Sequence, residues 1–226
     1  MTDRLRDELF QLIRCGMERE LPTHCPNVED CDELLRFAAR QSIRPIVYHG
    51  LKRLHAPEEY LKGHEKAWLS DVFHSVQRGE ALKAIRASLD AVGIPYILLK
   101  GAELRELYPD PTLRTSSDLD VLVREETLER AVSAIETDTD FRKLKRTYHD
   151  ISMANSSVHL ELHFHIKENA ENIDRLLSRA WDYAVATGEG SRYAFTPEYQ
   201  VFYILAHMCQ HFLHGGLGIK IGRAHV

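Results

Sequence analysis

Leu98-Leu99-Lys100-Gly101, followed by Asp118-Leu119-Asp120-Val121-Leu122-Val123, is the stretch of sequence that decides the fold. The apolar run from Ile94 to Leu99 predicts a buried strand, which ends at a glycine that begins a short helix. The second apolar run carries two aspartates at positions i and i+2. Because side chains alternate along a strand, Asp118 and Asp120 are expected on one face of the sheet.

Two neighbouring carboxylates raise each other's pKa unless a cation lies between them. A divalent metal ion is the simplest reason to place Asp118 and Asp120 together, and oxygen ligands favour Mg²⁺, with Mn²⁺ as the alternative. The sequence therefore predicts a metal site on the strand at residues 118–123.

A third acid is expected from Val158–Ile166, where apolar and polar residues alternate without a break. Glu161 belongs to the polar face of this predicted strand, and with Asp118 and Asp120 it would complete the three carboxylates of a two-metal phosphoryl-transfer or nucleotidyl-transfer site. A shift in strand register would instead turn Glu161 outward. The predicted apolar face is Leu160, Leu162, Phe164 and Ile166, and the polar face also has His159, His163 and His165.

The composition is that of an ordinary globular protein, with 226 residues, 44% hydrophobic and 28% charged. The formal net charge of −5 argues against a broad electrostatic contact with nucleic acid. No apolar run reaches the ~20 residues of a membrane-spanning helix, and the acidic N-terminus lacks the apolar core of a signal peptide. The four cysteines form no CxxC pair, which is typical of reduced thiols. We therefore expect a cytoplasmic protein with neither a membrane span nor a nucleic-acid partner.

Helical patterns dominate the first ninety residues, including a long helix predicted from about Glu65 to Val92. Short strands and helices then alternate, with a short helix predicted at 102–108, and Thr196-Pro197 predicts the start of a final helix. This alternation predicts an α+β domain in which the strands at 94–99, 118–123 and 159–166 are neighbours in one mixed sheet. We expect an N-terminal helical region at 1–92, a core at 93–190 and a C-terminal helical segment at 191–220.

The last six residues, Ile221–Val226, match a translated reading frame of a common sequencing adapter. We therefore expect residues 221–226 to be a non-native tail and the natural chain to continue beyond Lys220.

Three separated motifs carry a resemblance: LLKGAEL at 98–104, YPDPTLRTSSDLDVLV at 108–123 and VHLELHFHI at 158–166. Together, in this order, they resemble the nucleotidyltransferase superfamily of the DNA polymerase β-like fold, and within it a group of bacterial and archaeal proteins described only as nucleotidyltransferase family proteins. The resemblance implies a polymerase β-like core with a small mixed sheet, flanked by an N-terminal helical region and C-terminal helices.

The resemblance also implies roles for single residues. Asp118 and Asp120 match the metal-binding DxD motif, and Glu161 matches the third acid. Gly101 matches the turn before the helix whose N-terminus faces the nucleotide phosphates, a place where free backbone amides attract anions; a positive φ is another reason for glycine there. The Gly-Ser of the superfamily is Gly101-Ala102 here, so a hydroxyl contact to phosphate is lost.

Several basic side chains could assist this site. Lys100 and Arg114 are candidates for nucleotide binding, the alternatives being a solvated lysine and a structural salt bridge. His163 is expected to support the site as a neighbour of the metal or by a hydrogen bond to Glu161. His207 and His211 fall at i and i+4 on one helical face, a spacing that can chelate metal, although we favour packing against the sheet.

The predicted function is Mg²⁺-dependent transfer of a nucleoside monophosphate from a nucleoside triphosphate to a hydroxyl of a small molecule or protein, with release of pyrophosphate. Asp118, Asp120 and Glu161 are the expected catalytic and metal-binding residues. One alternative is a non-catalytic relative that binds nucleotide or a partner. The other is a metal-dependent hydrolase that uses the histidines of residues 159–165 together with Glu161.

Overall fold

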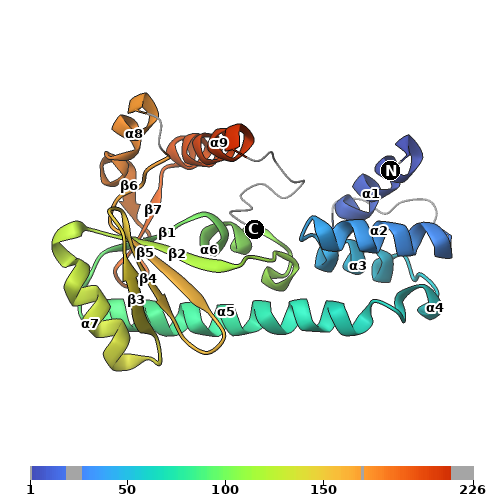
Figure 1. The fold of residues 1–226 in the computed structure, drawn as a ribbon, viewed down its shortest axis with the longest axis horizontal. Coiled ribbons are helices and arrows are strands. Elements are labelled where there is room, and N and C mark those ends of the chain that lie inside the picture. The colour runs from blue at the N-terminus through green and yellow to red at the C-terminus, as the bar shows by residue number, and fades with distance from the viewer. Residues whose placement is uncertain (1, 19–26, 169–170, 215–226) are drawn as a thin grey trace. The chain divides into compact units, whose positions relative to one another are not determined.

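The computed structural model describes residues 2–18, 27–168 and 171–214, which form two compact units (Figure 1). Unit 1 comprises the described residues of 1–76 and 105–115, and unit 2 comprises those of 77–104 and 116–214. The expected tail at 221–226 lies outside the described residues. The region boundaries expected from the sequence stay predictions.

Unit 1 is built from helices, two of which begin after a residue whose side chain caps the helix N-terminus. The Thr2 side chain accepts a hydrogen bond from the Leu5 amide, and Asn27 accepts one from the Asp30 amide, so each satisfies a free amide at a helix start. Leu9, Leu35 and related apolar residues form a separate core. The helices are α1 (Asp3–Gly16), α2 (Val28–Arg40), α3 (Arg44–Arg53), α4 (Glu58–Leu61), the first part of α5 (Glu65–Ala91) and the short 3-10 helices Arg105–Leu107 and Pro111–Leu113.

Unit 2 is organised around a mixed sheet of seven strands among the described residues, in the order β3-β4-β5-β2-β1-β7-β6. The predicted neighbours are confirmed: β2 pairs with β1 in an antiparallel manner and with β5 in a parallel manner. The strands are β1 (Tyr96–Leu98), β2 (Asp118–Val123), β3 (Arg142–Arg146), β4 (Asp150–Ala154), β5 (His159–His163), β6 (Ala184–Ala186) and β7 (Arg192–Phe195).

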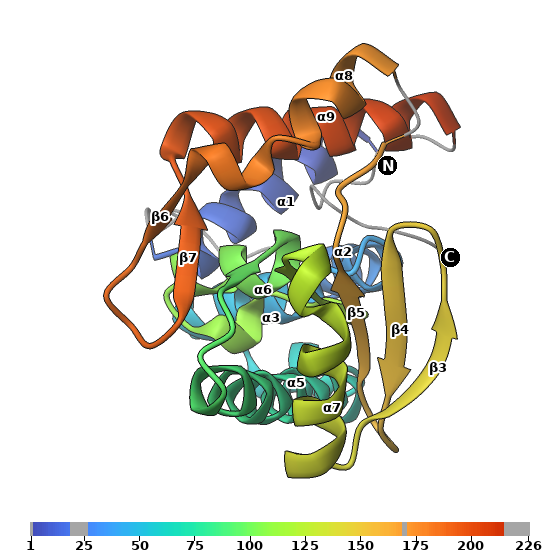
Figure 2. The same ribbon diagram turned by 90° about the vertical axis from the view of Figure 1, so that its left-hand side faces the viewer.

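Helices cover both faces of this sheet (Figure 2). The last part of α5 and α7 (Leu128–Asp138) pack on one face, where Ile85 and Ile135 join Val121 and Leu162 in a single core. On the other face, α8 (Glu171–Leu177) and α9 (Pro197–His214) cover part of the sheet, where Leu177 and Tyr203 meet Leu122. The remaining elements are α6 (Lys100–Leu104) and the 3-10 helices Glu125–Thr127 and Ala180–Tyr183. Among the described residues, none of the helices combines the length and the apolar character that a membrane crossing requires.

Two local predictions were wrong, and two strands were missed. The strand predicted at 158–166 ends at His163, so Ile166 joins the core on the opposite face from Leu160 and Leu162. The predicted helix at 102–108 begins earlier, at Lys100, and ends at Leu104, where a 3-10 turn follows. The sequence reasoning did not predict strands β6 and β7.

Candidate functional site

The pairing of β2 with β5 sets the geometry of the predicted acids. In this parallel pair Asp120 lies directly opposite Glu161, and Asp118 lies opposite His159. The alternate side chains of both strands, such as Val121 and Leu162, are buried in the core on the other face. The alternation of the two strands and their register therefore bring Asp120 and Glu161 together on the face away from that core.

Asp120 is the most enclosed of the three acids, with 3% of its surface exposed. Its Oδ1 atom accepts hydrogen bonds from Lys100 Nζ at 3.0 Å and from His163 Nε2 at 3.1 Å. Burial alone would raise the pKa of Asp120, but the charge of Lys100 and the hydrogen bond from His163 outweigh it and hold the pKa well below its usual range. Asp120 is therefore an ionised carboxylate within a buried ion pair.

His163, the last residue of β5, contacts a carboxylate on each of the two strands. Its Nε2 atom lies 3.4 Å from Glu161 Oε2, in addition to its contact with Asp120. Burial lowers the pKa of His163, but its hydrogen bonds to the two carboxylates raise it more, so the net pKa lies above the usual value. The same hydrogen bond from His163 lowers the pKa of Glu161. His163 thus contacts both Asp120 and Glu161, whereas the sequence reasoning had named only Glu161 as its partner.

Asp118 has a different environment from the other two acids. Its side chain is half-buried and its Oδ1 atom accepts a hydrogen bond from Ser117 Oγ at 3.2 Å. Burial and the negative charges of Asp120 and Glu161 raise the pKa of Asp118. Burial is the largest of these causes, and the part that comes from the two neighbouring carboxylates is the part that a bound cation would relieve.

Lys100 and Gly101 lie where the sequence placed them, between β1 and β2. Lys100 takes a left-handed backbone conformation with φ of 43°, which is rare for a residue with a side chain and typical of functional positions. The positive φ considered for Gly101 was therefore assigned to the wrong residue, since it belongs to Lys100. Burial lowers the pKa of Lys100, but the attraction of Asp120 outweighs it and the net pKa lies well above the usual value. Arg114 is buried and belongs to unit 1.

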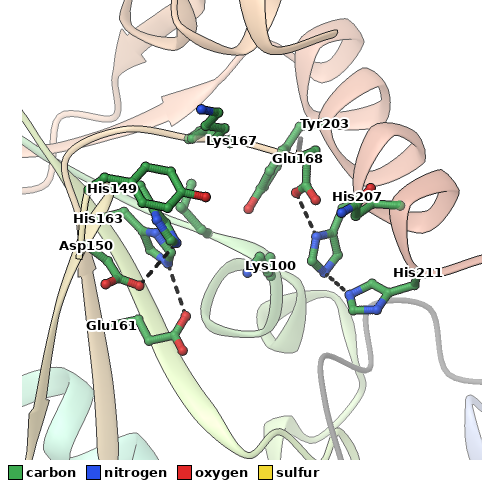
Figure 3. Close-up of a pocket in the computed structure, with 14 residues that line it drawn as sticks. Lys100, His149, Asp150, Glu161, His163, Lys167, Glu168, Tyr203, His207 and His211 are labelled. Carbon is green, nitrogen blue, oxygen red and sulfur yellow. Dashed lines mark hydrogen bonds and ion pairs between the residues drawn. The ribbon is translucent and has the colours of Figure 1, made fainter. Parts of the chain in front are cut away.

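A cavity of about 380 Å³ opens beside this cluster, within unit 2 (Figure 3). Lys100, Glu161 and His163 line it, while Asp118 and Asp120 do not. The volume is in the range of small-molecule sites. The close-up shows a second polar group across the cavity from Glu161 and His163. That group consists of Glu168, Tyr203, His207 and His211.

Two sets of side chains in the described part of the chain could hold a metal ion. One is Asp120, Glu161 and His163, and the other is His149, Asp150 and His163; in each set the ligand atoms lie within 4.8 Å of one another. Asp118 belongs to neither set. The structure thus brings together two of the three predicted acids with His163, and adds Asp150 and His149, which the sequence reasoning missed.

His149 and Asp150 carried one usable signal in the sequence. They stand at the start of β4, which pairs with β5, and a His-Asp pair beside a His-rich strand is a set of metal-ligand side chains. Glu168 carried no such signal in the sequence, because it follows the end of β5 in an irregular segment. Its place on the cavity depends on how the chain turns after His163.

Of three comparisons with known proteins, one found a match. No match was found among curated proteins, and none among solved structures. The family model described as "Uncharacterised nucleotidyltransferase" matches residues 27–221, a range that contains the DxD strand, the Glu161 strand and the residues that line the cavity. Since the match covers most of the chain, the protein belongs to this nucleotidyltransferase family.

Proposed function

We propose that this protein is a Mg²⁺-dependent enzyme that transfers a nucleoside monophosphate from a nucleoside triphosphate to a hydroxyl of a small molecule or protein, releasing pyrophosphate. Nucleotidyl transfer in general follows from the family. The observation that carries the finer proposal is the register of β2 and β5, which sets Glu161 opposite Asp120 at the wall of a cavity.

The donor atoms fit Mg²⁺. Asp120 and Glu161 offer carboxylate oxygens within 4.8 Å of each other, and oxygen is the ligand that Mg²⁺ prefers. Burial and, after it, the charges of Asp120 and Glu161 raise the pKa of Asp118, so the three carboxylates act on one another electrostatically. His163 adds a nitrogen to the same group, which would also suit Mn²⁺. We therefore assign Asp118, Asp120 and Glu161 as the residues that would hold the metal, with His163 in support.

Bound Mg²⁺ would supply activation of the acceptor hydroxyl and neutralisation of charge on the departing pyrophosphate. The chain's own residues would bind and orient the triphosphate. Lys100 keeps a positive charge at the cavity wall, where it would pair with phosphate oxygens, and Gly101 lies beside it in α6. Arg114 is proposed as a third nucleotide-binding residue on the basis of the sequence resemblance.

Two alternatives each have one observation in their favour. Ala102 stands where the superfamily has a serine, and loss of that hydroxyl favours a non-catalytic nucleotide-binding relative. The group of His149, Asp150 and His163 favours a metal-dependent hydrolase, because imidazole-rich sites prefer Zn²⁺.

The test is a screen of the four common nucleoside triphosphates with pooled cell metabolites and Mg²⁺, read by pyrophosphate release. We expect release by the natural sequence and loss of at least about 100-fold in Asp120→Asn and Glu161→Gln, since each removes a charge that would hold the metal. Asp138→Asn is the matched control, because Asp138 is an exposed residue at the end of α7.

Two other outcomes would support the two alternative functions, and a third would refute the assignment of the site. Nucleotide binding without pyrophosphate release would support the non-catalytic relative. Hydrolysis of a substrate by the Zn²⁺-loaded protein, without nucleotide, would support the hydrolase. Full activity in Asp120→Asn would refute the assignment of the carboxylates.

A further inference from the structure

The wall of the cavity across from Glu161 holds two histidines whose ring nitrogens converge. His207 and His211 lie one turn apart on α9, and their Nε2 atoms are 2.9 Å from each other (Figure 3). The Nδ1 atom of His207 lies 2.8 Å from Glu168 Oε1. The sequence reasoning favoured simple packing for this pair, yet both rings line the cavity.

Glu168 determines which nitrogen of His207 is available. Glu168 and His207 are each 7% exposed, so an ionised Glu168 needs a hydrogen-bond donor close by. Donation from His207 Nδ1–H meets that need and leaves the lone pair of His207 on Nε2, the atom that faces His211. A carboxylate that accepts the second ring N–H is the usual companion of a metal-binding histidine.

The spacing of the two Nε2 atoms is close to what a shared metal requires. With Zn–N bonds of about 2.0–2.1 Å, two tetrahedral ligands stand about 3.3 Å apart. The observed 2.9 Å needs an opening of roughly 0.4 Å, which small rotations of the two side chains provide. Residues at i and i+4 share a helix face, so the backbone of α9 already supports this approach.

We propose that His207 and His211 bind one imidazole-preferring divalent ion, of which Zn²⁺ is the representative, through their Nε2 atoms. Glu168 is the positioning residue that orients His207. The remaining coordination positions face the cavity, where water or oxygen atoms of a bound substrate complete the shell. Nitrogen ligands select Zn²⁺ over Mg²⁺, so this site is chemically distinct from the carboxylates.

The proposed site shares no residue with the other metal-binding groups of the described chain. Those groups consist of Asp120, Glu161 and His163, and of His149, Asp150 and His163. In the close-up, Lys100 lies between Glu161 and His163 on one side and the pair on α9 on the other. The Zn²⁺ site proposed on α9 and the Mg²⁺ site of the proposed function can therefore be tested separately, because a variant of one site leaves the ligands of the other in place.

The experiment is a calorimetric titration of Zn²⁺ into untagged, chelator-treated protein in the presence of excess Mg²⁺, which is added to fill the proposed carboxylate site. We expect His207→Ala and His211→Ala each to bind one Zn²⁺ fewer than the natural sequence. Glu168→Gln should keep the stoichiometry and bind about tenfold more weakly. His165→Ala is the matched control, because His165 is exposed and lies outside these groups.

Thermal unfolding of each metal-free variant checks that the fold is intact, and Glu168→Gln preserves shape if an alanine variant does not fold. Equal Zn²⁺ stoichiometry and affinity in the natural sequence, His211→Ala and Glu168→Gln would overturn the proposal. Loss of the Zn²⁺ site in His163→Ala but not in His211→Ala would also overturn it. Absence of Zn²⁺ binding to the natural sequence would leave the 2.9 Å contact as an N–H···N hydrogen bond and refute the site.

Discussion

Replacing Asp120 by asparagine in metal-free protein removes one negative charge from the centre of the site while keeping the shape of the side chain. Lys100 Nζ and His163 Nε2 both donate to Asp120 Oδ1, at 3.0 and 3.1 Å. The side chains of Lys100 and Asp120 are 16% and 4% exposed, so hydration compensates for little of the electrostatic attraction that Lys100 loses. Asp120→Asn therefore leaves a nearly buried ammonium group without its counter-charge.

The expected cost follows from the distance and the burial. Two unit charges 3.0 Å apart attract by about 5 kcal/mol at an effective dielectric constant of about 20, before the cost of desolvation is subtracted. Breaking one side of a buried pair costs about 3–5 kcal/mol. Because Lys100 keeps partial contact with water and asparagine retains an oxygen acceptor, we expect a loss of about 3 kcal/mol.

Urea unfolding in the presence of a chelator at pH 7 measures this loss. Trp181 lies in unit 2 and Trp68 in unit 1, so fluorescence in a Trp68→Phe background reports on the unit that contains the site. Adding Lys100→Met to Asp120→Asn removes the unpaired ammonium, and the double variant should recover about 2 kcal/mol. A loss below about 0.5 kcal/mol in Asp120→Asn, or no coupling with Lys100→Met, would refute the argument that this ion pair is enclosed and net stabilising.

Three further predictions concern packing and metal binding. Leu162→Ala, at a fully buried position of β5, should cost about 2–5 kcal/mol, whereas Val185→Ala on the exposed strand β6 should cost under about 1 kcal/mol, both by urea unfolding. Gly50→Ala should destabilise unit 1 by about 1–3 kcal/mol or more, because its Cβ would lie 2.4 Å from the Leu12 carbonyl oxygen; Gly63→Ala meets open space and should be close to neutral. Mg²⁺ at 100 times its dissociation constant should stabilise the natural sequence by about 2.7 kcal/mol and Asp120→Asn far less, and equal stabilisation of both would exclude a metal at Asp120.

Local sequence patterns were enough to predict several secondary-structure elements and the face on which their side chains lie. The two-residue alternation of residues 118–123 and 159–163 was enough to predict which side chains share a face, because successive side chains of any strand point to opposite sides. The three strands that carry the site were predicted as neighbours from a different pattern, the alternation of short apolar runs with helical segments. The helical stretch through residue 91 also followed from periodicity and capping residues such as Asn27. Strand β7 carries a weak signal in its Arg-Tyr-Ala-Phe sequence, but four residues are too few to distinguish a strand from a loop.

The tertiary structure alone decided which groups meet. Asp120 and Glu161 are opposite each other because β2 and β5 pair in one register, and register depends on the packing of both faces rather than on either strand by itself. The bond between Glu168 and His207 joins residues 39 positions apart, from a segment without regular structure and from the last helix. The sequence by itself determined the chemical groups and the faces that carry them, whereas their pairing required long-range contacts that no local pattern encodes.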